Sequence, residues 1–139
     1  MTTAADIMHT GAQWIPATET LDRAAQLMAR LNVGALPVSG PDERMSGIIT
    51  DRDIVVQCVA KGHDPAKVTC GDLVHGTPRW IDADATVDQV LDEMESHQIR
   101  RLPVIKDKRL VGMISEADLA THVTDRQLAG FVEKVYAKV

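Results

Sequence analysis

Two short motifs in this sequence place a hydroxyl side chain three residues before a carboxylate: Thr50 with Asp53, and Ser115 with Asp118. A carboxylate can accept hydrogen bonds from both hydroxyls of a ribose, as the acidic residue of dinucleotide-binding folds does. Each hydroxyl residue lies where a predicted strand becomes a helix, so the free N–H groups of that helix start can bind a phosphate. The spacing lets hydroxyl and carboxylate face one ligand. The two motifs therefore indicate nucleotide binding.

The same spacing also has a structural interpretation, the capping box. In that arrangement Thr50 or Ser115 caps the following helix, while Asp53 or Asp118 reaches back to the N–H of the capping residue. Both interpretations stay open for each copy of the motif. One copy can bind a ligand while the other is purely structural.

An internal repeat supplies the elements that would position these motifs. Leu36-Pro37-Val38 recurs 66 positions later as Leu102-Pro103-Val104. Beyond this tripeptide the offset falls to 65, which pairs Gly47 with Gly112 and Asp53 with Asp118. The lost residue falls between two apolar runs, where a loop absorbs a change of length at little cost. The repeat therefore indicates two copies of one structural unit.

Each copy has the pattern strand, helix, strand, strand, helix. Apolar residues at helical spacing predict a helix behind Thr20 and another behind Thr86, which forms a capping-box pattern with Gln89. In each copy, two short β-rich runs around a polar turn predict a hairpin that leads directly into a further helix. The predicted hairpins are Ala35–Ser39 with Met45–Thr50, and Leu102–Ile105 with Leu110–Ser115; the helices that follow them are 51–60, ended by Gly62, and 116–122.

These elements predict an α+β fold in which each copy forms a small mixed sheet with helices on one face. Such a unit alone leaves apolar surface bare, so we expect the copies to pack about a pseudo-twofold axis and the chain to form a homodimer. The predicted division is a first repeat over 1–62, a linker over 63–69, a second repeat over 70–125 and a helical extension over 126–139. The extension, with Phe131 and Val135 at helical spacing, is available for a dimer contact or folds back on its own core.

Composition and charge exclude several classes of function. The chain has 20 Asp+Glu against 15 Lys+Arg, a net charge of -5, and no basic run longer than Arg100-Arg101. It therefore lacks the basic surface that nucleic-acid binding needs. No apolar stretch approaches the roughly 20 residues that span a bilayer, and the start lacks a secretion signal. We therefore expect a cytoplasmic location without a membrane partner.

Neither a metal site nor an active site is expected. The pairs Cys58 with His63 and Cys70 with His75 could supply four ligands to a tetrahedral zinc ion, but their spacing matches no standard zinc signature. Cys58 falls on the apolar side of its helix, where a buried and inert thiol is the ordinary case. The sequence has no glycine-rich phosphate loop, nucleophile elbow or His-Glu-x-x-His motif, so we expect no catalysis and no required cofactor.

Taken together, the residues resemble the CBS domain, whose pattern is a helix, Leu-Pro-Val, a turn and then Gly-apolar-apolar-Thr/Ser-x-x-Asp-apolar. Two copies in tandem resemble a CBS pair, or Bateman module, and the similarity covers roughly residues 3–123. The segments 47–54 and 112–119 are close matches to the most diagnostic part of the family pattern. The resemblance implies adenosine-type regulatory ligands (AMP, ADP or ATP, in some members NAD or S-adenosylmethionine) in clefts between the repeats.

The resemblance also implies a set of binding residues in each copy. In the first copy these are Ala35, Pro37, Thr50, Arg52 and Asp53, and in the second they are Arg100, Arg101, Pro103, Ser115 and Asp118. Basic residues before Leu-Pro-Val contact phosphates in some family members, which the resemblance implies for the arginine pair. The alternative is a solvated pair that balances Glu93 or Glu95. Because the first copy has Gly34-Ala35 where the second has this pair, we expect sites of unequal affinity or ligand.

Little of the sequence lies outside the predicted pair, so the first hypothesis is a non-enzymatic ligand sensor that acts in trans on an unidentified protein partner. The alternative is a nucleotide-independent dimeric interaction or scaffold protein whose clefts are structural and vacant. A test of nucleotide binding separates these two hypotheses.

Overall fold

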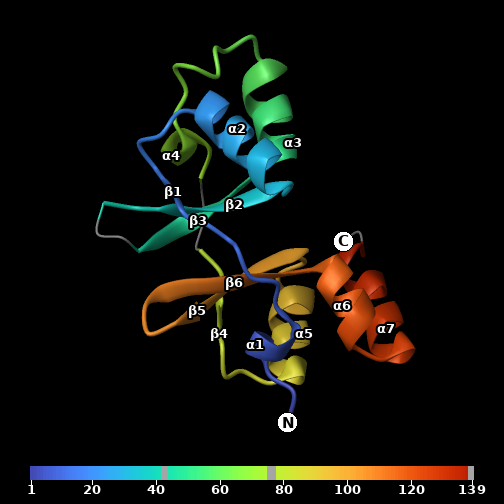
Figure 1. The fold of residues 1–139 in the computed structure, drawn as a ribbon. Helices are drawn as coiled ribbons and strands as arrows, with labels where there is room; N and C mark the ends of the chain where they lie inside the picture. The colour runs from blue at the N-terminus through green and yellow to red at the C-terminus, as the bar shows by residue number, and fades with distance from the viewer. Residues whose placement is uncertain (42–43, 75–77, 138–139) are drawn as a thin grey trace. The chain divides into compact units, whose positions relative to one another are not determined.

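The computed structural model describes residues 1–41, 44–74 and 78–137 and shows the expected mixed α+β fold. The predicted order strand, helix, strand, strand, helix occurs twice (Figure 1). The first copy contains β1 (Ile15–Pro16), α2 (Leu21–Leu31), β2 (Ala35–Ser39), β3 (Met45–Thr50) and α3 (Asp51–Ile54). The second contains β4 (Ile81–Asp82), α5 (Val87–Ser96), β5 (Arg101–Lys106), β6 (Arg109–Ser115) and α6 (Glu116–His122). The remaining helices are α1 (Ala4–Ile7), η1 (Val55–Val59), α4 (Cys70–Leu73) and α7 (Asp125–Val135).

Each copy forms its own three-stranded sheet, in the orders β1-β2-β3 and β4-β5-β6. In each sheet the first strand runs parallel to the second, and the second and third strands form the predicted antiparallel hairpin. The hairpin registers place Ala35 opposite Thr50 and Arg101 opposite Ser115. The first strand of each hairpin therefore begins beside the residue at which the next helix starts.

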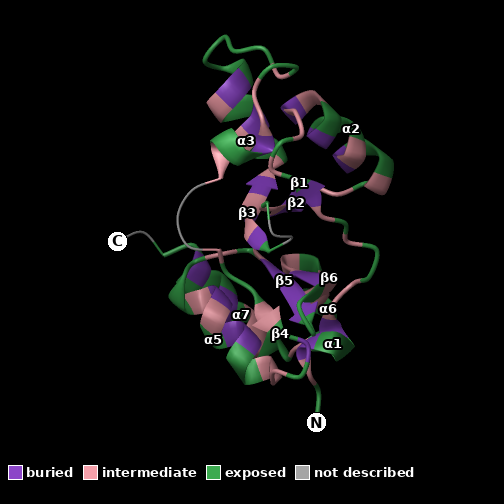
Figure 2. Ribbon diagram, turned by 90° about the vertical axis from the view of Figure 1, so that its left-hand side faces the viewer, coloured by how far each residue is buried: buried purple, intermediate pink, exposed green. Residues whose placement is uncertain are grey.

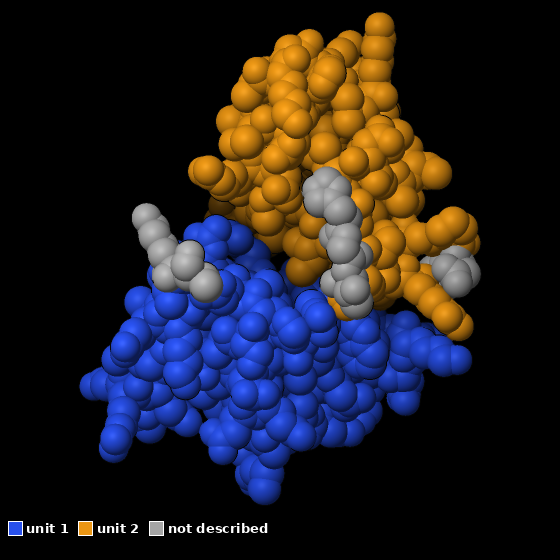
Figure 3. Space-filling view, turned by 180° about the vertical axis from the view of Figure 1, so that it is seen from behind, with its two compact units in different colours: residues 1–12, 79–139 blue, residues 13–78 orange. Residues whose placement is uncertain are grey.

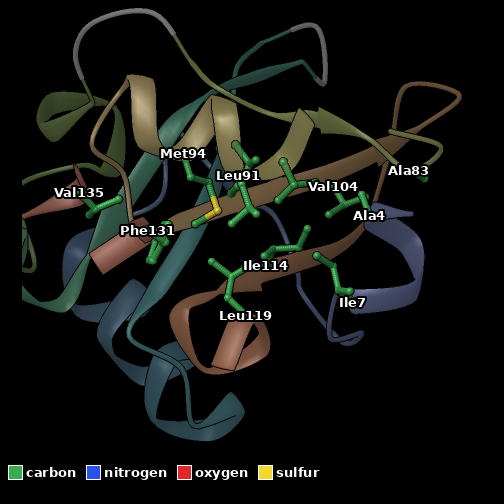
Figure 4. Close-up of a cluster of buried hydrophobic side chains, with 12 residues drawn as sticks. Ala4, Ile7, Ala83, Leu91, Met94, Val104, Ile114, Leu119, Phe131 and Val135 are labelled. Atoms are coloured by element: carbon green, nitrogen blue, oxygen red, sulfur yellow. The ribbon is translucent and has the colours of Figure 1, made fainter. Parts of the chain in front are cut away.

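Alternate strand residues of each sheet face a hydrophobic core covered by helices, as the period of two along a strand requires. The fully or almost fully buried strand residues are Leu36, Val38 and Ile49 in the first copy, and Leu102, Val104 and Ile114 in the second. Figure 4 shows the second-copy cluster, in which side chains of α1, α5, α6 and α7 meet the sheet. The helices bury one face and expose the other (Figure 2), which is the amphipathic pattern expected from the sequence.

The helix predicted over residues 51–60 begins as α3 and continues as the π-helical segment η1. Its inner face carries Cys58, which is fully buried as predicted, and its outer face carries three exposed valines, Val55, Val56 and Val59. The chain leaves the helix at Gly62, where φ is +74°, a left-handed conformation that glycine adopts without a steric penalty. Gly62 therefore ends this helix, as the sequence predicted.

In space the chain divides into two compact units, which Figure 3 shows in different colours. Unit 1 contains residues 1–12 and 79–139, and unit 2 contains residues 13–78. Helix α1 lies at the start of the first repeat in sequence but packs on the core of the second. Helix α4 lies at the start of the second repeat, and its residue Cys70 lies in the core of the first. The compact units and the sequence repeats are therefore two different divisions of the chain.

Backbone hydrogen bonds fix this exchange of helices. In unit 1 the N–H of Ala4 donates to the carbonyl of Ala85 at 2.8 Å, and in unit 2 the N–H of Cys70 donates to the carbonyl of Glu19 at the same distance. Residues 4 and 70 are 66 positions apart, and so are residues 19 and 85. The two copies have therefore exchanged equivalent N-terminal segments.

Helix α7 folds back on the core of its own unit. Phe131 is fully buried there and Val135 is 7% exposed, whereas Val132 and Tyr136 stay exposed. The fold-back alternative therefore holds for the inner face of this helix. No helix within the described ranges combines the length and the apolar character that crossing a membrane requires.

Candidate functional site

The first-copy motif lies at the junction of β3 and α3 and forms a capping box. The N–H of Thr50 donates to Oδ2 of Asp53 at 2.9 Å, and the N–H of Asp53 donates to the Thr50 hydroxyl oxygen at 3.1 Å. These two bonds satisfy N–H groups that a helix start otherwise leaves unpaired. They also hold the Asp53 carboxylate, which is half-buried, in one orientation at the end of the strand.

The second-copy motif lies at the junction of β6 and α6 and contains the same pair of residue types with an additional partner. Oδ2 of Asp118 accepts hydrogen bonds from the N–H of Ser115 at 2.8 Å and from the Ser115 hydroxyl at 3.0 Å. The same oxygen lies 2.6 Å from Nδ1 of His9. Because an ionised carboxylate only accepts hydrogen bonds, Nδ1 is the donor in this contact. The capping geometry is thus present in both copies, but the second carboxylate has a further partner.

The segment around His9 is attached to the free edge of the second sheet. The N–H of His9 donates to the carbonyl of Met113 at 2.9 Å, and the N–H of Met113 donates to the carbonyl of His9 at 3.0 Å. This approach depends on Gly112, because a Cβ atom there would meet Sδ of Met8 and would lie 2.8 Å from the His9 carbonyl oxygen. The glycine shared by both copies thus explains how the N-terminal segment reaches the second motif.

The arginines predicted to bind phosphate are placed differently in the two copies. Arg101 begins β5 and lies opposite Ser115 across the hairpin. Arg100 donates from Nη1 to the Tyr136 hydroxyl at 3.3 Å and lies over the Tyr136 ring, 5.7 Å from its centre. The Tyr136 hydroxyl donates in turn to Oε1 of Glu116 at 2.7 Å, beside the second motif. In the first copy, Arg52 is exposed on α3.

The carboxylates proposed to balance the arginine pair have other partners. Glu93 lies 3.8 Å from Nη1 of Arg79, and Glu95 lies 3.6 Å from Nζ of Lys134. These ion pairs tie α5 to its own surroundings within unit 1. The contact of Arg100 with Tyr136 instead points its guanidinium toward the start of α6.

The three remaining predicted residues lie on the hairpins. Ala35 is opposite Thr50, Pro37 is opposite Ile48, and Pro103 is opposite Met113. The structure thus brings together Ala35 and the Thr50 motif in unit 2, and Arg101 and the Ser115 motif in unit 1. Each proline lies two residues farther along its strand, on the same face of the sheet.

Sequence reasoning missed two residues near the second motif, His9 and Tyr136. His9 is 109 positions from Asp118, and Tyr136 lies 36 positions from Arg100, in the C-terminal extension. One signal was available for the N-terminal segment, because the offset of 66 also pairs Thr3 and Asp6 with Thr69 and Asp72. No pattern in the sequence pairs an individual histidine with an individual aspartate at such a separation.

The possible zinc ligands do not come together in the described part of the chain. Cys58 and Cys70 are both fully buried, and Sγ of Cys58 contacts the backbone carbonyl of His63 at 3.5 Å. Burial and, as a smaller cause, the neighbouring Glu19 carboxylate together raise the pKa of the Cys70 thiol to about 11. Among the described residues no group of three His, Cys, Asp or Glu side chains could hold a metal ion. His75 lies outside the described residues.

Comparison with known proteins identifies the repeated unit. The model of the CBS domain family matches residues 4–59 and again residues 70–125. Hypoxic response protein 1 of Mycobacterium tuberculosis is 44% identical to this chain over 135 residues, which make up 97% of this chain and 94% of that protein. The matched ranges include both hydroxyl and carboxylate motifs.

Two solved structures are similar to this one. The crystal structure of Hypoxic Response Protein I with two coordinated zinc ions has a TM-score of 0.78 and 46% identity, covering 88% of this chain and all of that chain. A CBS domain protein, PAE2072 from Pyrobaculum aerophilum, was solved in complex with AMP; its TM-score is 0.77 at 22% identity, covering 94% of this chain and 98% of that chain. The second similarity concerns the fold alone.

Proposed function

We propose, from the premise that this chain belongs to the CBS domain family, that it is a non-catalytic regulatory module that binds an adenosine-type ligand such as AMP, ADP or ATP. The observation that carries the proposal is the state of the two motif carboxylates. Asp53 and Asp118 are each held by a capping box through Oδ2, and among the described residues Oδ1 of each has no hydrogen-bond partner. Each motif therefore combines a fixed carboxylate with an unused acceptor.

The proposed roles follow from the chemistry of these groups. Oδ1 of Asp53 or Asp118 accepts a ribose hydroxyl, as acidic residues of nucleotide-binding folds do. In the second copy Arg100 and Arg101 provide guanidinium groups for the phosphate, which they can bind through two parallel hydrogen bonds. In the first copy Arg52 takes that role, and Ala35 and Pro37 line the ligand from the strand. Pro103 takes the corresponding position in the second copy. AMP bound to PAE2072, which shares this fold, supports a nucleotide as the ligand class.

The output of such a module is a change of affinity for a partner. Ligand binding shifts a conformational equilibrium only by the difference in its affinity for the two states, and that shift can be transmitted to another protein in trans. A second copy of this chain is one such partner, and we propose a homodimer. The alternative, a scaffold that works without nucleotide, needs no ligand and is decided by the experiment below.

The zinc in the crystal structure of the mycobacterial relative does not enter this proposal. The described His, Cys, Asp and Glu side chains contain no group of three that could hold a metal ion, and the two cysteines are buried in a hydrophobic core. His75, the fourth residue of the possible zinc set, lies outside the described residues.

The proposal is tested by calorimetric and thermal-shift titration of ligand-free protein with AMP, ADP, ATP, NAD and S-adenosylmethionine. A ligand present at about 100 times its Kd stabilises the folded state by roughly 2.7 kcal/mol, which raises the unfolding midpoint by several degrees. We expect Asp53→Ala and Asp118→Ala each to remove one binding event and the double variant to remove both.

The control for this experiment is Asp72→Ala. Asp72 accepts a hydrogen bond from the N–H of Thr69 in the capping box of α4, so its loss removes a cap of the same type outside both motifs. Binding should persist in this variant. Protein that binds none of the five compounds, or that binds them equally after the Asp53 and Asp118 substitutions, contradicts the sensor hypothesis and supports the scaffold.

A further inference from the structure

We propose that His9 is a built-in competitor for ligand at the second-copy motif, because its imidazole occupies the Asp118 oxygen that a second ribose hydroxyl needs. The inference rests on the proposed function, since it assumes that the Asp118 carboxylate accepts hydroxyls of an adenosine-type ligand. It goes further by assigning a residue outside the matched second repeat to the regulation of that site. All the groups involved lie in unit 1.

Three hydrogen-bond donors converge on one oxygen of the Asp118 carboxylate. Oδ2 of Asp118 accepts from the N–H of Ser115, from the Ser115 hydroxyl and from Nδ1 of His9. The two oxygens of a carboxylate together offer about four lone-pair positions, two on each oxygen, so three donors are one more than Oδ2 can accommodate. A ligand therefore finds only Oδ1 available on Asp118. A ribose hydroxyl can bind Oδ2 only when both the His9 imidazole and the Ser115 hydroxyl have released it.

The three donors differ in how readily they can leave Oδ2 of Asp118. The bond from the Ser115 N–H belongs to the capping box of α6 and stays, whereas the Ser115 hydroxyl can turn its hydrogen away from Oδ2 without uncapping the helix. The His9 side chain is 40% exposed, and its bond to Asp118 is its only side-chain hydrogen bond among the described residues. Its backbone stays fixed to Met113 by two hydrogen bonds when the ring turns away. The ring is therefore the group that a ligand displaces.

The carboxylate of the first copy has fewer donors on the corresponding oxygen. Oδ2 of Asp53 accepts one hydrogen bond, from the N–H of Thr50, among the residues that the structure describes. Oδ2 of Asp118 accepts two more, from the Ser115 hydroxyl and from Nδ1 of His9. The contact at 2.6 Å is as short as a charge-assisted hydrogen bond, the stronger class. The His9 contact thus gives the second motif a barrier to ribose binding that the bonds recorded for the first motif lack.

The experiment measures binding at the second motif alone, in full-length protein that carries Asp53→Ala. AMP is the probe, and its Kd is measured by calorimetry with His9 intact and with His9→Ala or His9→Leu. Both substitutions remove the donor, and the second keeps a side chain of similar bulk. We expect AMP to bind about tenfold more tightly to both variants, because a hydrogen bond to a charged group no longer has to be broken. Thermal unfolding confirms that each protein is folded.

Three controls make the result specific. His9→Asn retains an N–H donor near the position of Nδ1 and should restore the original Kd. His63→Ala removes an exposed histidine of the other unit and should leave Kd unchanged. With 2′-deoxy-AMP, which lacks one of the two ribose hydroxyls, His9→Ala should produce a much smaller gain, since no second hydroxyl can use the vacated position on Oδ2.

The outcomes separate this inference from the function on which it rests. AMP binding that depends on Asp118 but is unchanged or weakened by His9→Ala overturns the inference and leaves the proposed function intact. Equal gains with AMP and 2′-deoxy-AMP also overturn it, because the gain would then not come from the second hydroxyl. Absence of AMP binding in every protein, the His9 variants included, overturns both. Tighter AMP binding that His9→Asn reverses and that 2′-deoxy-AMP does not share supports both.

Discussion

At the scale of single residues, the two copies of one motif have acquired different surroundings. Thr50 with Asp53 and Ser115 with Asp118 both form the capping geometry that their spacing allowed, so the structural interpretation is confirmed for each. Capping uses Oδ2 of each carboxylate and does not compete for Oδ1, so a structural role and a binding role are compatible. The proposed inequality between the sites then comes from His9. Among the described residues, its side chain hydrogen-bonds to Asp118 and not to Asp53.

The buried cysteine of α4 supports a prediction about reactivity and pH. Because the pKa of Cys70 is raised to about 11, its thiol stays protonated near neutral pH and is a poor nucleophile. Iodoacetamide at pH 7.5 should leave Cys70 unmodified in the folded protein and modify it in guanidinium chloride. Peptide mass mapping measures the modification at each cysteine. Rapid labelling of folded protein would contradict the buried position of this thiol.

The raised pKa of the Cys70 thiol also predicts how the stability of the protein depends on pH. The folded state holds the Cys70 proton more tightly than the unfolded chain, whose thiol has a pKa of 9.0. The contribution of the Cys70 thiol to the free energy of unfolding is therefore fully present below pH 9. It is lost as the pH rises toward 11, so the folded state becomes less stable over that range. Urea titrations of the natural protein and of Cys70→Ala measure this. The natural protein should lose more stability over that range, and parallel curves would contradict the prediction.

At the scale of elements, helix α7 connects the core to the second motif. Its buried face places Phe131 and Val135 in the core of unit 1, and its last turn accepts two hydrogen bonds from Nε2 of Gln98, at the carbonyls of Lys134 and Ala137. The helix thereby holds Tyr136 between Arg100 and Glu116. A helix that lies outside the family match except for its first residue thus positions Arg100, which is proposed to bind phosphate.

Substitutions on the two faces of α7 test this packing. Phe131→Ala should lower the free energy of unfolding by about 3–5 kcal/mol, the usual cost of truncating a fully buried phenylalanine. Val132→Ala, at the adjacent position but 46% exposed, should change it by less than about 0.5 kcal/mol. Urea unfolding at two protein concentrations measures both. Equal effects of the two substitutions, or a loss for Phe131→Ala that depends on protein concentration, would indicate a dimer contact instead.

At the scale of the whole molecule, the exchange of α1 and α4 explains why the two compact units differ from the two sequence repeats. Each unit takes its short capped helix from the other repeat, so neither repeat of the sequence is complete by itself as a compact unit. The segment that carries His9 belongs to unit 1 for this reason. A ligand that displaced His9 would act on the chain segment that leads into unit 2. Ligand binding at the second motif would thereby be connected through the backbone to the other unit.

The proposed homodimer is tested through the exposed valines of α3 and η1. Val55 and Val59 are 57% and 56% exposed and lie on the same side of the helix as Val56. Light scattering after size exclusion should give about twice the chain mass of 15.2 kDa for the natural protein and one chain mass for a variant with Val55→Glu and Val59→Glu. Val132→Glu, on α7, should remain dimeric. A natural protein that is monomeric at about 100 μM would contradict the proposal, because a dimer with a roughly micromolar Kd is formed at that concentration.

The sequence by itself determined the elements and their repetition. Local patterns were sufficient for this, because hydrophobic periodicity, turn residues and caps act over a few positions: both hairpins, the helices behind Thr20 and Thr86, the stop at Gly62 and the buried Cys58 all appear as predicted. The offset of 66 and the diagnostic segments also sufficed for the family. The position of each motif at a junction of strand and helix followed from the same local patterns.

Only the tertiary structure decided which distant residues meet at these junctions. His9 reaches Asp118 because an edge strand offers free backbone groups to residue 9 and because Gly112 leaves room for that segment. Tyr136 reaches Arg100 because Phe131 anchors α7 in the core. Such contacts depend on packing between elements that are far apart in the chain, and the periodicity of a sequence contains no information about that packing. The fold class was therefore predictable from local patterns, whereas the partner that distinguishes the two carboxylates was not.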